Sequence, residues 1–198
     1  MKIYDCFIFF NELDLLELRL NILNDYVDYF VIVESAITFQ GEDKEFIFEK
    51  NKSRFAKFEN KIIYFKVEKY ELDFAKLPFI AEPKNADEIV LNKIYKFIDD
   101  CPHFDKKTQF WWGNDFFQRE CIWRALAVSN PAADDIIIIS DVDEIPNPEI
   151  VKTLKGKLLP ESLFCLRQHE FCYYLNYYHN PDWVGTCCFL YASFNNTS

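Results

Sequence analysis

Three carboxylates stand close together in the chain, at Asp141, Asp143 and Glu144. Like charges at this spacing repel one another unless a cation or a proton neutralises them. Oxygen ligands of this kind suit Mg²⁺ or Mn²⁺, and such ions usually join a protein carboxylate to a substrate phosphate. The pattern therefore indicates a metal-assisted site for a phosphate-bearing ligand. The alternative is a solvated acidic turn, which an Asp-x-Asp pattern taken by itself would favour.

A run of four isoleucines, Ile136 to Ile139, precedes these carboxylates. It is too short to span a membrane, and its β-branched side chains favour a strand buried on both faces, as in the middle of a parallel or mixed sheet. Pro146 then stops the extended segment. Because ligands of open α/β sheets bind beyond the carboxyl ends of the strands, this strand weakens the solvated-turn interpretation.

Two more strands are expected near the start of the chain, over Ile3–Phe10 and Val27–Glu34, with a helix between them. The helix has an apolar stripe at residues 13, 16, 20 and 23, with Glu17, Arg19 and Asn21 off it. A connection of this length permits a right-handed parallel crossover. The polar residues that follow the two strands should then reach the same sheet edge as the acidic turn; they are Asn11, Glu12, Glu34 and Ser35.

A second strong helix is predicted over Asn114–Ser129, ended by Asn130-Pro131. Its first turns carry Gln118 and Arg119. In so acidic a chain, Arg119 is a candidate contact for a diphosphate or for uracil, and pairing with Asp115 or Glu120 on its own helix is an equal alternative. The preceding Trp111-Trp112 pair could stack on a sugar, although core or hinge packing is favoured about two to one for such aromatics.

The remaining elements complete an α/β fold, a mostly parallel central sheet flanked by helices with a mixed β tail. The irregular stretch 71–107 is expected to hold an acceptor-side loop or lid. The other predicted elements are a short strand or extended segment at Lys44–Glu49, a helical turn at Asn51–Phe58, a strand at Ile62–Val67, helices at Asp87–Ile98 and Pro148–Leu154, and three tail strands, expected to pair antiparallel, at Leu163–Arg167, Phe171–Tyr177 and Thr186–Tyr191.

The overall composition narrows the possible partners. The 198 residues suit a single domain, and a net charge of −10 argues against nucleic acid or an anionic membrane surface as the main partner. No signal peptide or transmembrane span is expected. The seven cysteines, without any CxxC, are interpreted as free thiols in a reducing compartment, with Cys6, Cys121 and Cys165 buried. A zinc site is disfavoured because the three histidines lack ligand spacing.

Several motifs, taken in order, resemble glycosyltransferase family 17, the family of the β-1,4-mannosyl-glycoprotein β-1,4-N-acetylglucosaminyltransferase that adds bisecting N-acetylglucosamine. The similarity runs from the first strand to about Gly185. The matching segments are Asp5-Cys6-Phe7, Phe10 to Arg19, Val27 to Ser35, Gly41 and Lys44, Asn114-Asp115 with Gln118-Arg119, and Asp141 to Pro146.

The resemblance implies a GT-A-type fold, a UDP-sugar donor (UDP-N-acetylglucosamine in the family), dependence on Mn²⁺ or Mg²⁺, and inversion at the anomeric carbon during glycan biosynthesis. It implies that Asp143 is the main metal ligand and that Asp141, in the DXD motif, contacts the ribose or the metal. Gln118 and Ser35 would join the donor-binding residues. Those carried over by position are Asn11, Glu12, Glu34 and Arg119.

The C-terminal part departs from the family, whose members continue past Ser198 through a Gly-Gly-Trp-His-Phe-like segment. The chain is therefore expected to be one glycosyltransferase domain, 1–198, with a donor-binding part at 1–146 and an incomplete acceptor-side part at 147–198. Within it, Glu170 and Asp182 are the candidates for the catalytic base. A base and a further metal ligand beyond Ser198 are the alternative.

Two other functions compete with a glycosyltransferase acting on a glycan or glycoconjugate. A non-catalytic nucleotide-sugar-binding module would fit a shortened family member. A haloacid-dehalogenase-type phosphatase also has an apolar strand before Asp-x-Asp, but that motif usually opens its chain, and Ile145 here stands where Thr or Val is usual. Without an anchor, a cytoplasmic enzyme of a bacterium or virus is expected.

Overall fold

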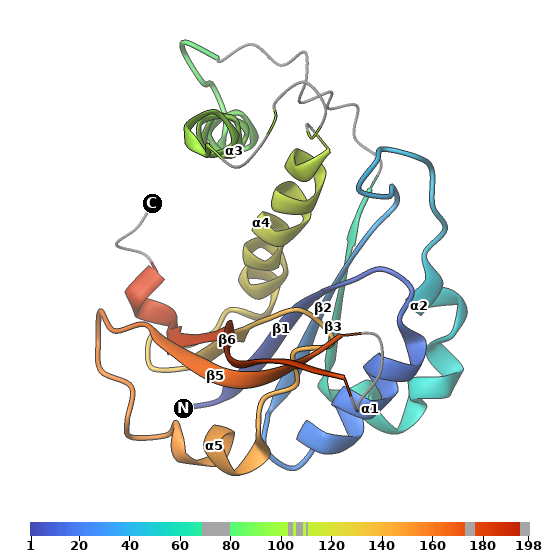
Figure 1. Ribbon diagram of the computed structural model, residues 1–198, viewed down its shortest axis with the longest axis vertical. Coiled ribbons are helices and arrows are strands. Elements are labelled where there is room, and N and C mark those ends of the chain that lie inside the picture. Colours follow the sequence, from blue (N-terminus) through green and yellow to red (C-terminus); the bar gives the residue numbers. More distant parts are fainter. Residues whose placement is uncertain (69–79, 103–104, 106–108, 110, 173–176, 195–198) are drawn as a thin grey trace.

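The computed structural model describes residues 1–68, 80–102, 105, 109, 111–172 and 177–194. A sheet of six strands in the order β3-β2-β1-β4-β6-β5 forms its centre, with helices on both faces (Figure 1). The first four strands of this order run parallel, and β6 and β5 are antiparallel to their neighbours. This confirms the predicted α/β class, with the parallel strands at the core and the mixed part at the end of the chain.

The parallel half is built around β1 (Ile3–Phe9), every residue of which is buried. It pairs with β2 (Tyr29–Ser35) on one side and with β4 (Ile136–Ile139) on the other, and β3 (Ile62–Val67) pairs with β2. Runs of apolar residues without alternation are typical of strands covered on both faces. The parallel register brings the ends of β1, β2 and β4 to one edge of the sheet.

Two hydrophobic clusters cover the opposite faces. One contains Phe7 and Phe9 of β1 and packs under α1 (Leu13–Leu23), α2 (Ile47–Lys50), the 3₁₀ segment η1 (Lys52–Lys61) and α5 (Pro148–Thr153). The other contains Cys6 and Ile8 and packs under α3 (Ala86–Asp100) and α4 (Trp112–Ser129). Successive residues of β1 thus pack into the two clusters in turn, because successive side chains of a strand point to opposite faces of the sheet.

The ends of two helices follow from local side-chain chemistry. Asn130 ends α4 in the left-handed conformation (φ 48°), which asparagine tolerates better than most residues, and Pro131 cannot continue the helix. Asn147 caps α5, since its side chain accepts a hydrogen bond from the Glu149 amide and Pro148 occupies the first turn. The predicted ends of both helices hold to within a residue or two.

The antiparallel half is a hairpin of two strands, β5 (Phe164–Phe171) and β6 (Tyr178–Leu190). Of the three predicted tail strands, Leu163–Arg167 overlaps the start of β5 and Thr186–Tyr191 overlaps the end of β6. The predicted middle strand, Phe171–Tyr177, begins at the last residue of β5, and its residues 173–176 lie outside the described residues. Residues 187–190 of β6 pair with β4, so the earlier part of β6 continues past the carboxyl end of β4. The hairpin therefore extends along the edge that carries the acidic turn. The short 3₁₀ segment η2 (Tyr191–Phe194) follows β6.

Other parts of the structure differ in part from what the sequence predicts. The predicted short strand or extended segment at Lys44–Glu49 is found only in part, because residues 44–46 form neither helix nor strand and α2 begins at Ile47. Asp43, just before this segment, makes an isolated bridge with Ile37. Cys165 is exposed rather than buried, while Cys6 and Cys121 are buried as expected, and none of the cysteines forms a disulfide. The predicted loop at 71–107 lies partly outside the described residues, and α3 occupies its second half. Among the helices described, none has the length and apolarity needed to cross a bilayer.

Candidate functional site

A cavity of about 280 Å³ opens at the carboxyl end of β1 and β4, beside the first turns of α4. Its wall combines aromatic, acidic and cationic side chains with a few aliphatic ones. The lining residues are Ile8, Phe9, Phe10, Glu12, Phe39, Trp111, Trp112, Asp115, Gln118, Arg119, Asp141, Val142 and Asp143. Residues from four distant parts of the sequence thus meet at the edge where an open α/β sheet binds its ligands.

The acidic wall consists of Glu12, Asp141 and Asp143. The pKa of Asp143 is raised above 3.8, first by partial burial and then by the negative charges of Asp141 and Glu12. Negative charge is therefore concentrated at this wall and opposes the ionisation of Asp143. The groups offer only carboxylate oxygen, which is the donor set that Mg²⁺ and Mn²⁺ prefer. A divalent cation held by Asp143 and Asp141 fits this chemistry.

Arg119 is the cation of the cavity, with its side chain 36% exposed. Its Nε donates to Asp115 on the same helix at 2.8 Å, and one terminal nitrogen donates to Asp141 Oδ1 at 2.6 Å. Burial would lower the pKa of Arg119, but the hydrogen bonds to Asp141 and Asp115 outweigh it and raise the pKa above its ordinary value. Arg119 therefore pairs with Asp115 on its own helix and at the same time contacts Asp141 of the candidate site.

A buried arginine that the sequence analysis missed holds the acidic turn in place. Arg19 of α1 has no exposed surface and binds the Asp5 carboxylate through two nitrogens, at 2.8 and 2.6 Å. It also donates to Ser140 Oγ at 2.6 Å and to three backbone carbonyls of the turn, at 2.7, 3.3 and 3.2 Å; these belong to Asp141, Val142 and Glu144. One guanidinium thus joins β1, α1 and the turn.

The spacing could have revealed this role. Arg19 lies three residues after Leu16 and four before Leu23, so it shares their buried face, and placing it off the stripe was wrong. Its partner Asp5 stands within an otherwise apolar strand, where a carboxylate requires a buried cation.

Glu144, the third carboxylate of the sequence motif, is absent from the cavity lining. Its Oε2 accepts from the Asp141 amide at 3.1 Å, and its Oε1 accepts from Trp183 Nε1 at 2.6 Å. A Cβ added at Gly185 would lie 1.9 Å from Glu144 Oε1, so only glycine leaves room for this carboxylate. Glu144 therefore fastens the turn to β6.

The other predicted donor-binding residues divide into two groups. Gln118 lines the cavity, and its amide donates to the Val33 carbonyl at 2.9 Å, joining α4 to β2. Asn11, Glu34 and Ser35 do not line it. Glu34 is buried under α2, where Lys44 Nζ (2.6 Å), two helix amides and the Tyr64 hydroxyl donate to its carboxylate. In this geometry Glu34 caps α2.

Comparison with known families assigns the chain to one of them. The model of glycosyltransferase family 17 matches residues 1–100 and 88–195, which together span almost the whole chain. The chain belongs to glycosyltransferase family 17. No curated protein and no protein of solved structure matches it.

The aromatic wall of the cavity in this family 17 chain consists of Phe10, Phe39, Trp111 and Trp112. Trp111 and Trp112 stack with ring centroids 4.9 Å apart, and Phe10 stacks on Phe39 at 6.0 Å. Trp112 also stacks on Phe116 of α4, at 6.1 Å. Both tryptophans therefore pack in an aromatic cluster and also line the cavity, so the two sequence interpretations are compatible.

The two candidates for a catalytic base lie on the hairpin, and neither lines the cavity. Glu170 Oε2 is 2.9 Å from His179 Nδ1, and Asp182 accepts from Arg167 at 3.3 Å. Their assignment as bases of a family 17 transferase stays a prediction.

Proposed function

We propose that this chain transfers a sugar, N-acetylglucosamine by its family resemblance, from a UDP-sugar to a hydroxyl of a glycan, with inversion and with a divalent cation, Mn²⁺ or Mg²⁺. The observation that carries the proposal is the cavity itself. It places an all-oxygen acidic wall, a paired arginine and stacked aromatics together at the carboxyl edge of the parallel strands. A GT-A-type fold is supported by the DXD turn that directly follows β4 and by the antiparallel β6 beside it.

Each wall has a distinct task in this proposal. Asp143 and Asp141 would hold the cation, which when bound supplies positive charge to the departing diphosphate. Arg119, held by Asp115 and Asp141, presents a fixed positive charge to the same phosphates. The aromatic wall offers flat apolar surface on which a uracil base or a sugar ring packs. Arg19 holds the turn carbonyls, so that the carboxylates need little reorganisation on binding.

Inversion requires the acceptor hydroxyl to attack opposite the leaving diphosphate, with a base removing its proton. Asp182 and Glu170 are the carboxylates proposed for this step, and they lie on the hairpin that Glu144 fastens to the turn. A non-catalytic nucleotide-sugar-binding module is the second candidate, because neither of these two carboxylates lines the cavity.

The test is incubation with UDP-N-acetylglucosamine and Mn²⁺, with UDP release and calorimetric UDP binding as readouts. The wild-type chain should bind UDP more tightly with Mn²⁺ and release UDP from the donor. Asp143→Ala should lower release roughly a hundredfold or more, because the metal contributes several kcal/mol to the stabilisation of transition-state charge. Asp134→Ala alters an exposed carboxylate before β4 and should leave both readouts unchanged.

Each outcome separates the alternatives. Metal-dependent UDP binding without release, in the presence of varied glycan acceptors, would support the binding module. Unchanged metal-dependent UDP binding in Asp143→Ala would overturn the proposal at its centre.

A further inference from the structure

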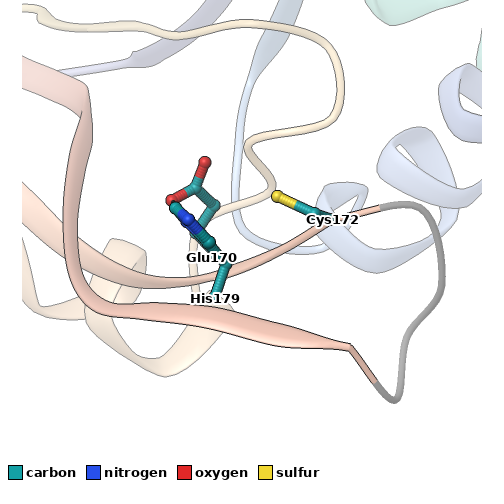
Figure 2. A group of neighbouring side chains, drawn as sticks. All are labelled: Glu170, Cys172 and His179. Carbon is teal, nitrogen blue, oxygen red and sulfur yellow. The ribbon is translucent and has the colours of Figure 1, made fainter.

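A second cluster of metal-ligating side chains lies on the hairpin, outside the cavity. Glu170 and Cys172 come from β5 and the residue just after it, and His179 comes from β6 (Figure 2). A carboxylate oxygen, the thiol sulfur and a ring nitrogen of these residues all lie within 4.8 Å of one another. Three different ligand types therefore converge on one point.

Strand pairing explains how residues this far apart in sequence converge. Glu170 and Cys172 are two positions apart and so point to the same face of the hairpin. Glu170 pairs with Asn180 and Phe171 with Tyr178, so the register shifts here and His179 is the extra residue of the bulged strand. His179 Nδ1 lies 2.9 Å from Glu170 Oε2, which puts the ring beside Glu170. The Cys172 amide donates to the Tyr177 carbonyl at 3.0 Å and holds the two strands together at this point.

We propose that Glu170, Cys172 and His179 form a zinc site, with the fourth position open to water. Thiolate, imidazole and carboxylate are the ligands that Zn²⁺ takes in proteins, and three protein ligands with one open position make a tetrahedral site. The thiolate disfavours Mg²⁺ and Mn²⁺, which prefer oxygen. On binding, the Cys172 thiol loses its proton to solvent and the sulfur forms the bond to the metal.

The geometry needs only small side-chain movements. Zinc–ligand bonds of about 2.0 to 2.3 Å at a tetrahedral centre put neighbouring ligand atoms about 3.3 to 3.6 Å apart. Glu170 Oε2 and His179 Nδ1 are 2.9 Å apart, so they would separate slightly to admit the ion. The sulfur, within 4.8 Å of both, would approach by about 1.5 Å at most. The Glu170 and His179 side chains are 28% and 59% exposed, which leaves a path for the ion.

This zinc site is separate from the cation proposed at Asp141 and Asp143. None of its three residues lines the cavity, and its nitrogen and sulfur donors select a different metal. The bound ion would cross-link the end of β5 to the start of β6. A carboxylate bound to zinc is not free to remove a proton, so zinc binding leaves Asp182 as the base candidate within the hairpin.

The experiment titrates the whole chain with Zn²⁺ against a chromophoric chelator, and with Co²⁺ by absorption spectroscopy. The wild type should bind one zinc ion tightly, and Co²⁺ should give the thiolate charge-transfer band together with tetrahedral d–d bands. Cys172→Ser should abolish the charge-transfer band, and Cys172→Ser and His179→Asn should each weaken zinc binding roughly tenfold or more, since even indirect partners of a metal contribute that much.

Two matched variants alter the same hairpin without touching the cluster. Cys165→Ser removes an exposed thiol whose sulfur lies 3.5 Å from that of Cys187, and His169→Asn removes a ring that packs on Tyr178. Both should bind zinc as the wild type does. Far-ultraviolet circular dichroism should be the same for all variants, because the altered side chains are not in the core.

Two results would overturn the proposal. One is the absence of zinc binding by a folded wild-type chain. The other is loss of the ion and of the cobalt charge-transfer band in Cys165→Ser but not in Cys172→Ser, which would assign the thiolate to the Cys165–Cys187 pair.

Discussion

The acidic turn after β4 and the Glu170–Cys172–His179 cluster are held in place in opposite ways. Arg19 of α1 holds the turn in place. It has no exposed surface and donates to three backbone carbonyls of the turn. The hairpin cluster is half-exposed and is positioned by strand pairing and by the 2.9 Å contact between Glu170 Oε2 and His179 Nδ1. A turn held by buried hydrogen bonds presents its carboxylates before any ligand arrives, whereas the cluster needs the ion itself to fix its geometry.

The largest effect should come from breaking the support of the turn. Arg19→Met leaves the Asp5 carboxylate buried without its cation, which should lower the free energy of unfolding by about 3–5 kcal/mol in urea denaturation. Asp5→Leu combined with Arg19→Met removes both charges and should recover part of that loss. A cost below about 1 kcal/mol for Arg19→Met would show that the pair does not hold the turn.

The next effect concerns the contact between the turn and the hairpin. Gly185→Ala places a methyl group on the Glu144 carboxylate, which must leave Trp183 and the Asp141 amide. The loss of these hydrogen bonds should cost about 1–2 kcal/mol. In a Glu144→Ala background the same change should cost little, because the clash is gone. Equal costs in both backgrounds, measured as a double-mutant cycle, would exclude a coupling through Glu144.

The smallest effect is electrostatic and depends on pH. Because the pKa of Asp143 is raised in the folded protein, its ionisation opposes folding, and this cost appears as the pH rises from the usual 3.8 through the raised value. Asp143→Asn should therefore raise the melting temperature of the metal-free chain at neutral pH. The gain should vanish well below pH 3.8, where the carboxyl is protonated in both the folded and the unfolded state. A gain that persists at low pH would point to packing instead of charge.

The sequence predicts the parallel half well because its strands are apolar on both faces. The isoleucine run and the strand Ile62–Val67 have their predicted bounds. The hairpin is harder to predict, because β5 alternates only between half-buried and exposed positions. Pro181, which normally argues against a strand, lies inside β6 where the register shifts between Glu170 and Gln168.

The acidic cavity and the hairpin cluster also differ in how well the sequence predicts them. Asp141 and Asp143 are neighbours in sequence, so their pattern was visible, and strand order indicated that Glu12 would join them. Arg119 was a candidate through the start of its helix, with pairing on that helix as an equal alternative. The hairpin ligands have no recognisable spacing, and only the antiparallel register brings His179 to Glu170. The proximity of these ligands depends on how β5 pairs with β6, which local sequence patterns specify weakly.

The most direct test of the central claim is a crystal structure with UDP and Mn²⁺, with anomalous scattering used to locate the metal. The account predicts Mn²⁺ on Asp143, in contact with the diphosphate, and the nucleotide in the cavity between the acidic turn and the aromatic wall. Mn²⁺ bound elsewhere, or UDP outside this cavity, would contradict it.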